Sequence, residues 1–412
     1  MTHEEITLAW LKVGWLPKET DGKTAGECLE ELKASLVDSG LQLQTDEIVR
    51  LISFVWAIEG RQGNLLDSKD LLKGEIVRSM ANAVATKWNV LKPQIERAAG
   101  LIKDRDLLEN YSSFNAIIVA LSWYRLVFNR FETAFGLRVP EHDALEKQLN
   151  ERAAHFVDRW VFASEWAGVW GSAAVNNFQL YASDLSRFQA ALANCSTHNL
   201  LTTVDEGVAA LIGRVGDRAF QSVDNIIVRD RRRVHQYYPF LWVWHRLEPS
   251  RWQYSSISMR TGRKRTSKLE VDHTIPDAWW QRLVDMLVEQ KLVIYTGPEE
   301  EKWKVAPDGF DSRNEASTFI NQLGNCSLLD KSFNISKSAE SMWSFLQQVH
   351  EFKDKKVNRS DWETALSLPP IMTAPDGISL ADLKDAIQTR DALIRRDLRD
   401  FIAGTKHRVD AS

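Results

Sequence analysis

Residues 268–276 read KLEVDHTIP, and residues 321–338 read NQLGNCSLLDKSFNISKS. Asp272 and His273 place a carboxylate next to an imidazole, so neighbouring positions can supply a metal ligand and a general base. The second segment adds Asn321, Asn325 and Asn334, whose amide groups can orient a histidine or complete a metal shell. Hydrolysis of a phosphodiester needs a polarising cation, an activated water and stabilisation of the leaving oxygen. Together the two segments predict metal-dependent phosphodiester hydrolysis.

Each part of this pattern also has a simpler structural explanation. An Asp-His dipeptide is common by chance and often marks the end of a strand or a turn. Asparagine and glycine, which recur in the second segment, are favoured turn residues. The ordered combination of both segments is therefore more informative than either one alone.

The whole chain has the composition of a globular protein. It has 412 residues, enough for two or three domains, with 44% apolar and 26% charged residues. The net charge of -4 excludes a uniformly basic surface for nucleic acid, so any such surface must be local. The three cysteines are far apart in the sequence and show no CxxC spacing, which fits a reducing cytoplasm. A cytoplasmic location without a membrane partner is expected.

The first half of the chain has the apolar spacing of packed helices. Residues 25–37 follow Thr24, a candidate cap, and carry leucines at helical spacing. The longest apolar run, residues 114–128, is interrupted by polar and charged residues, so it predicts a buried helix and no membrane span. Strand-like runs follow later, at residues 269–273 and 292–295. Residues 379–402 alternate acidic and basic side chains, which is typical of a solvated packing helix.

Two basic clusters precede the Asp-His pair in the sequence. One contains Arg231, Arg232 and Arg233, and the other contains Arg263, Lys264 and Arg265. Both could bind phosphate beside a hydrolytic site, although charged runs often form nothing more than solvated turns. The aromatic run at residues 237–244 could stack on bases, but its interleaved apolar residues favour core packing.

The order Asp272-His273-x-x-Pro276, Gly324-Asn325-x-x-Leu-Leu and Asn334-x-x-Lys337-Ser resembles the HNH, or ββα-metal, endonucleases. More narrowly, it is similar to the C-terminal nuclease part of GmrSD-type modification-dependent restriction and phage-defence proteins. The similarity covers most of residues 75–345, but only the nuclease motif is specific.

The resemblance implies a role for each matching residue. His273 would be the general base, and Asn325 would hold its ring, with Asn321 as a weaker candidate for the same supporting role. Asp272 and Asn334, the latter at the start of the following helix, would bind a divalent ion. Because all the protein ligands are oxygens, Mg²⁺ or Mn²⁺ is expected. Lys337 would contact DNA phosphate, although a plain surface lysine is the default interpretation.

The expected architecture is mostly α with a small α+β module. It comprises a helical domain at residues 1–225 for docking, an HNH ββα-metal nuclease domain at 226–350, and a helical tail at 351–412. The expected function is DNA cleavage in bacterial restriction or anti-phage defence. The chain lacks a nucleotide-binding signature, so a ParB-like nucleotidase would be a separate partner. Alternatives are a catalytically silent DNA-binding adaptor that docks such a nucleotidase, and a purely helical interaction protein.

Overall fold

The computed structural model divides the chain into two compact units, residues 1–220 and 221–412. It describes residues 3–39, 41–59, 73–102, 113–135, 140–169, 174–228, 231–255, 269–276, 278–280, 293–295, 303–305, 318–338, 345–346, 351–352, 355–356, 358–373, 375 and 378–407. These residues are mostly helical, and the described strands pair only as two-stranded antiparallel sheets. The mostly α fold class with a small strand-containing module is confirmed at this level.

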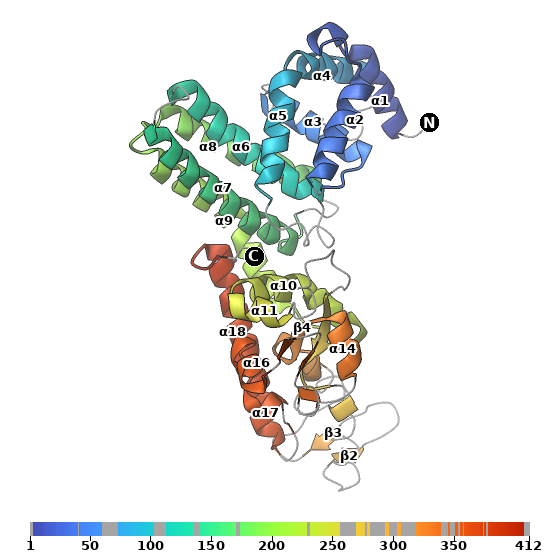
Figure 1. Ribbon diagram of the computed structural model, residues 1–412, viewed down its shortest axis with the longest axis vertical. Helices are drawn as coiled ribbons and strands as arrows, with labels where there is room; N and C mark the ends of the chain where they lie inside the picture. The colour runs from blue at the N-terminus through green and yellow to red at the C-terminus, as the bar shows by residue number, and fades with distance from the viewer. Residues whose placement is uncertain are drawn as a thin grey trace. The chain divides into compact units, whose positions relative to one another are not determined.

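The first unit is helical throughout its described residues (Figure 1). Its second helix, α2, begins after Thr24, as predicted. The Thr24 side chain and the Glu27 side chain each accept a hydrogen bond from the other residue's backbone N–H, which closes a capping box. The helices are α1 (His3–Gly14), η1 (Pro17–Glu19), α2 (Ala25–Asp38), α3 (Thr45–Glu59), α4 (Gly74–Thr86), α5 (Trp88–Gly100), α6 (Ser113–Phe135), α7 (Pro140–Trp166), α8 (Ala174–Asn194) and α9 (Leu200–Asn225). The last of these continues into the second unit.

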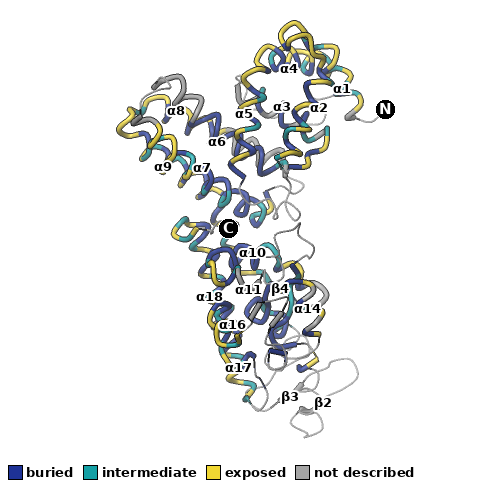
Figure 2. Tube along the Cα trace, in the orientation of Figure 1, coloured by how far each residue is buried: buried dark blue, intermediate teal, exposed yellow. Residues whose placement is uncertain are grey.

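Helix α6 contains the longest apolar run and lies in the core of the first unit (Figure 2). Every residue from 115 to 127 is buried. The polar interruptions have partners: Ser122 donates to the carbonyl of Ile118 at 2.7 Å, and Asn115 donates to Glu165 at 2.9 Å. The buried-helix prediction is thus confirmed. No helix in the described part of the chain has the length and apolar character needed to cross a bilayer.

The second unit contains a strand pair followed at once by a helix. Strand β1 (Leu269–His273) pairs antiparallel with β4 (Cys326–Asp330), with Asp272 opposite Ser327 and His273 opposite Cys326. Helix α14 (Lys331–Lys337) follows β4 directly. The other elements are η4 (Arg231–Tyr237), α10 (Tyr238–Arg246), α11 (Pro249–Ser255), β2 (Val293–Tyr295), β3 (Trp303–Val305), η5 (Leu323–Asn325), β5 (Glu351–Phe352), β6 (Lys355–Lys356), α16 (Arg359–Ala365), α17 (Pro370–Thr373) and α18 (Leu380–Ala403).

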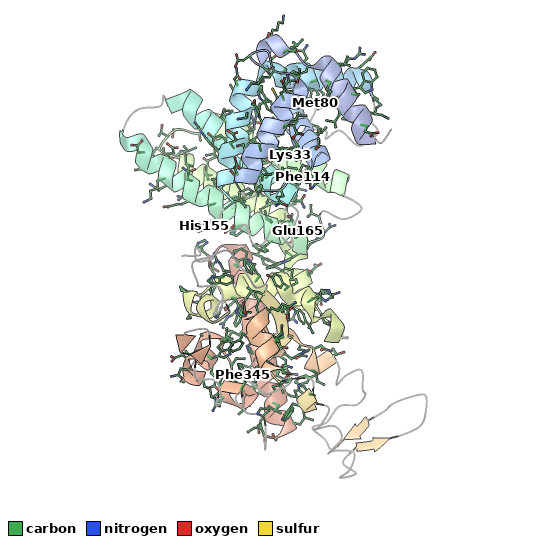
Figure 3. The ribbon with its side chains drawn as sticks, turned by 45° about the vertical axis from the view of Figure 1, so that its right-hand side comes forward. Lys33, Met80, Phe114, His155, Glu165 and Phe345 are labelled. Atoms are coloured by element: carbon green, nitrogen blue, oxygen red, sulfur yellow. The ribbon has the colours of Figure 1, made fainter. Side chains whose placement is uncertain are left out.

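The residues expected to form a helical tail that packs on the rest of the chain, 351–412, belong to this same unit and complete its core. Trp362 from α16 stacks on Phe333 of α14 with ring centroids 5.1 Å apart, and Phe345 meets Phe333 edge-on. Phe345 is labelled in Figure 3. Ile387 of α18 joins the same apolar cluster. The strand–strand–helix module is therefore buried against the C-terminal helices.

Helix α18 packs on the rest of its unit and leaves most of its charged residues at least partly exposed, as predicted, but some of its charges face the core. It begins after Ser379, whose hydroxyl accepts from the Asp382 backbone at 3.1 Å, as predicted. However, Arg390 and Asp397 are only 1% and 0% exposed. The Asp397 carboxylate accepts from the indole of Trp244 at 3.0 Å and forms an ion pair with Arg251 at 3.2 Å. Because buried charges need polar partners, these contacts explain how charged residues can face the core.

Side chains cover the edge of β4 that faces away from β1. Arg390 donates to the carbonyl of Cys326 at 2.8 Å, and the backbone N–H of Leu328 donates to His245 Nε2 at 3.3 Å. Both backbone groups would otherwise be unpaired at the edge of a two-stranded sheet. Since Nε2 of His245 accepts a hydrogen bond, the neutral ring carries its proton on Nδ1.

His245 is expected to make the second unit sensitive to acid. Burial, followed by the nearby charges of Arg390 and Arg251, lowers the pKa of His245 well below its ordinary value. The unfolded chain takes up a proton at this residue near pH 6.5, but the folded chain does not. Stability is therefore fully present above that pH and falls as the pH decreases below it.

The measurement compares the free energy of urea unfolding at pH 7 and pH 5.5 in wild type and His245→Gln. Glutamine keeps an acceptor for Leu328 N–H but does not titrate. We expect wild type to lose about 1 kcal/mol more than the variant over this interval. Equal losses would show that His245 is protonated in the folded protein.

Candidate active site

Asp272 and His273 lie at the end of β1, where successive side chains leave a strand on opposite faces. The Asp272 side chain meets α14: the ammonium of Lys337 lies 2.8 Å from its Oδ2 atom. Lys337 is only 1% exposed, whereas the Asp272 side chain is 23% exposed. Two residues earlier on the same face, Glu270 pairs with Lys331 at 3.1 Å. The helix thus covers the carboxylate-bearing face of β1.

His273 is held by Asn321, the residue expected to be the weaker candidate. His273 Nε2 lies 2.9 Å from the side-chain oxygen of Asn321, and the two residues are 8% and 2% exposed. A carbonyl oxygen only accepts, so Nε2 carries a hydrogen and the basic lone pair of a neutral ring is on Nδ1. This arrangement leaves Nδ1 as the proton acceptor and fixes the orientation of the ring.

The prediction that Asn325 holds the imidazole is wrong. Its side-chain oxygen accepts from the backbone N–H of Ile275 at 3.0 Å, and its amide group donates to the carbonyls of Ile320 and Ile275 at 2.9 and 3.3 Å. The backbone of Asn325 also accepts from Thr274 N–H at 2.7 Å. Because it is fully buried and bonded to both segments, Asn325 joins the loop after β1 to the turn before β4. It positions the two residues that follow His273.

Gly324, beside Asn325, is where this turn meets α18. A Cβ atom at Gly324 would collide with the carbonyl oxygen of Ile387, so only glycine allows this approach. Arg390 donates to the Gly324 carbonyl at 2.6 Å, to the Cys326 carbonyl at 2.8 Å and to Ser327 Oγ at 3.1 Å. Burial lowers the pKa of Arg390 to about 9, so the guanidinium stays charged at neutral pH.

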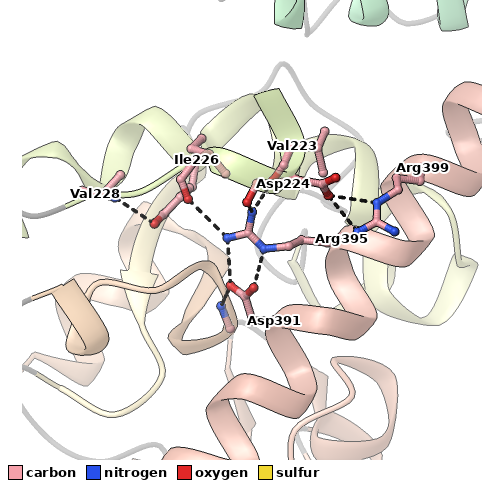
Figure 4. A network of polar contacts seen from close by, with 9 residues as sticks. Val223, Asp224, Ile226, Val228, Asp391, Arg395 and Arg399 are labelled. Carbon is pink, nitrogen blue, oxygen red and sulfur yellow. Dashed lines mark hydrogen bonds and ion pairs between the residues drawn. The ribbon is translucent and has the colours of Figure 1, made fainter. Parts of the chain in front are cut away.

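The contact continues through a second arginine on α18, shown in Figure 4. Asp391 accepts from the backbone N–H of Gly324 at 3.1 Å and also pairs with Arg395. Arg395 donates in turn to the backbone carbonyls of Val223, Asp224 and Ile226. These carbonyls belong to the end of α9 and the residues after it, where a helix leaves carbonyls without intrahelical partners. A continuous polar network therefore connects the turn before β4 with the end of α9.

The proposed metal ligands are only partly assembled. Asn334 is the fourth residue of α14, not its first, and its side chain makes no hydrogen bond within the described part of the chain. It lies one turn before Lys337, on the same side of the helix as the lysine that contacts Asp272. Among the described residues, no three histidine, cysteine or carboxylate side chains cluster as a metal site.

One observation fits a cation at Asp272. Its Oδ2 atom is buried and already lies 2.8 Å from one cation, the ammonium of Lys337. A carboxylate oxygen that attracts a cation is a suitable ligand for a hard divalent ion, and an amide such as that of Asn334 can supply a second oxygen. These two oxygen donors could hold a hard divalent ion such as Mg²⁺ or Mn²⁺.

The structure revises or leaves open several of the expected DNA contacts. Lys337 is neither a surface lysine nor free to reach phosphate in this arrangement, because its ammonium is buried against Asp272. The backbone of Arg231, Arg232 and Arg233 forms the start of η4, but their side chains lie outside the described residues. Arg263, Lys264 and Arg265 also lie outside them. The aromatic run at 237–244 contributes buried residues from α10, as the core-packing interpretation predicted.

The sequence pattern missed Arg390 and Asp391, although a signal was present. Leu383, Ile387, Ile394 and Leu398 recur at helical spacing in α18 and are all buried. Arg390 falls on this same apolar stripe. A charged residue in a buried stripe indicates an internal polar partner, here the carbonyls of the turn before β4.

The comparisons with protein-family models, with curated proteins and with solved structures each return nothing. The function is therefore inferred from the chemistry of the residues around Asp272 and His273.

Proposed function

We propose that this chain is a metal-dependent endonuclease of the HNH type that hydrolyses DNA phosphodiester bonds. The observation that carries the proposal is the arrangement at the end of β1. An imidazole held by an amide lies next in the strand to a carboxylate whose buried oxygen attracts a cation, here the ammonium of Lys337. The strand bearing both residues pairs with β4, and α14 follows directly, in the order ββα. General-base and metal-assisted hydrolysis need these groups together.

In the proposed reaction, His273 Nδ1 removes a proton from a water molecule as the water oxygen attacks phosphorus. The bond from phosphorus to the leaving oxygen breaks, and that oxygen gains a proton from solvent. Asn321 keeps the ring aligned through its hydrogen bond to Nε2. A divalent ion held by Asp272 and Asn334 would stabilise negative charge on the phosphate and the leaving oxygen. Asn325 and Arg390 support the site by holding the turn before β4.

A catalytically silent adaptor is the second candidate function, and a specific observation favours it. Lys337 already neutralises Asp272, and His273 is 8% exposed. In that case the strand–strand–helix module would bind DNA, and the helical unit would dock a separate nucleotidase. A role in restriction or anti-phage defence would apply to either candidate and rests on the resemblance alone.

The two functions are separated by a plasmid-cleavage assay. Supercoiled plasmid is incubated with the full chain in Mg²⁺, in Mn²⁺ or in EDTA, with and without a candidate nucleotidase partner. Nicked or linear products that appear only with a divalent ion would support the nuclease. Cleavage that persists in EDTA would contradict metal dependence, and no cleavage under any condition would favour the adaptor.

The basic cluster at residues 263–265 yields a binding prediction. Each phosphate contact by a lysine or arginine releases condensed counterions, so it contributes about 0.9 to the slope of log affinity against log salt. Replacing Arg263, Lys264 and Arg265 by glutamine is expected to flatten that slope by about 2 to 3. Fluorescence anisotropy with a labelled duplex at several salt concentrations measures it. An unchanged slope would assign this cluster to a solvated turn.

A further inference from the structure

Two lysine–carboxylate pairs connect β1 and α14, and they differ in burial. In the outer pair, Lys331 and Glu270 are 52% and 37% exposed and lie 3.1 Å apart. In the inner pair, Lys337 is 1% exposed and lies 2.8 Å from Asp272. The outer pair is an ordinary surface ion pair that contributes little to stability. The inner pair buries an ammonium group, so its desolvation costs free energy that only its contact with Asp272 offsets.

We propose that Lys337 is an internal cation that occupies the Asp272 carboxylate until a divalent metal displaces it. The proposal rests on the proposed nuclease function and concerns how the same site is regulated. In the folded protein, the Lys337 ammonium occupies the position next to Oδ2 of Asp272 where a metal ion would be attracted most strongly. A divalent ion that reaches the same carboxylate meets a positive charge at short range, and the two repel. The metal therefore binds only if the lysine moves away.

The burial of the two partners supports this exchange. Lys337 approaches the carboxylate from the interior, because its own side chain is almost fully covered. The Asp272 side chain keeps 23% of its surface exposed, so a hydrated ion can approach from solvent. Once released, the ammonium needs another anion, and the phosphate of a bound substrate would provide one. Lys337 would thus set the concentration of divalent metal above which the site is loaded and able to hydrolyse DNA.

Metal binding tests this directly, without any need for activity. The affinity of Mn²⁺ alone is measured by calorimetry for wild type, Lys337→Met, Lys331→Met and Asp272→Asn. Methionine keeps the length of the side chain and removes the competing charge. We expect Lys337→Met to bind Mn²⁺ about tenfold more tightly or better, Lys331→Met to match wild type, and Asp272→Asn to lose the site.

The outcomes separate this proposal from the nuclease proposal. If Lys337→Met binds Mn²⁺ no more tightly than wild type, while Asp272→Asn abolishes binding, the displacement is wrong and the metal site stands. If no form of the protein binds Mn²⁺, the metal-dependent function fails along with the displacement.

A measurement on the wild-type protein covers the case in which Lys337→Met does not fold. Reductive methylation followed by mass spectrometry reports which lysines reagents can reach. Lys337 should be protected in EDTA and become labelled in Mn²⁺, whereas the exposed Lys331 should be labelled in both. Equal protection of Lys337 in EDTA and in saturating Mn²⁺ would overturn the displacement.

Discussion

Replacing His273 by alanine is expected to slow plasmid cleavage by about 10²- to 10⁴-fold, the usual contribution of a positioned general base. The neutral imidazole of His273 offers a ring nitrogen that can accept the proton of the attacking water. Its partner Asn321 fixes which nitrogen does so. The rate is measured with Mn²⁺ at saturating enzyme, so that a change in DNA binding does not hide the chemical step.

Two further variants make this result specific. His273→Gln can still donate a hydrogen bond to Asn321 but cannot act as the base, so it should be as inactive as the alanine variant and fold like wild type. His235, an exposed histidine of the same unit, provides the matched control, and His235→Ala should cleave at the wild-type rate. If His273→Ala and wild type cleave equally, His273 is not the base.

The second large effect is on stability. Arg390→Met is expected to lower the free energy of unfolding of the second unit by about 3–5 kcal/mol. The guanidinium donates to the carbonyls of Gly324, Cys326 and Leu366 and to the hydroxyl of Ser327, all from a position that is 1% exposed. Methionine fills much of the same space but leaves the buried acceptors without a donor, and each such group costs about 1–3 kcal/mol.

Urea unfolding followed by tryptophan fluorescence measures the loss. Arg396, which is 64% exposed on the same helix, provides the matched control, and Arg396→Met should change stability by no more than about 0.5 kcal/mol. Hydrogen exchange of residues 324–330 should speed up in Arg390→Met and remain unchanged in the control. Equal stability of the two variants would mean that the turn before β4 does not depend on α18.

Local patterns were sufficient for several elements. The candidate cap Thr24 and the leucines that follow it predicted α2, because both signals act within one or two turns of helix. The apolar run at 114–128 predicted a buried helix. A separate strand-like run at 269–273 predicted β1. Ser379 marked the start of α18. In each case, interactions between residues that are close in the sequence are enough to favour that helix or strand.

The site was predictable only in its composition. The spacing of Asp272, His273 and three asparagines indicated which residues belong together, but it did not indicate which amide meets the imidazole. Asn321 and Asn325 have the same donor and acceptor groups. The path of the backbone through the 3₁₀ turn η5, directly before β4, decides that Asn321 and not Asn325 faces His273. The type of side chain determines which hydrogen bonds a residue can make, whereas the path of the backbone determines which partner lies within reach.

The sequence alone determined that this chain is mostly helical, that a short strand ends in Asp272 and His273, and where the helices α2 and α18 begin, because those features depend on contacts between near neighbours. The tertiary structure alone decided that Asn321 holds the imidazole, that Lys337 is buried against Asp272, and that Arg390 faces inward. The physical reason is burial. The cost of removing a charge or an amide from water depends on partners that lie 48 to 66 residues away in the chain and are brought close only by folding.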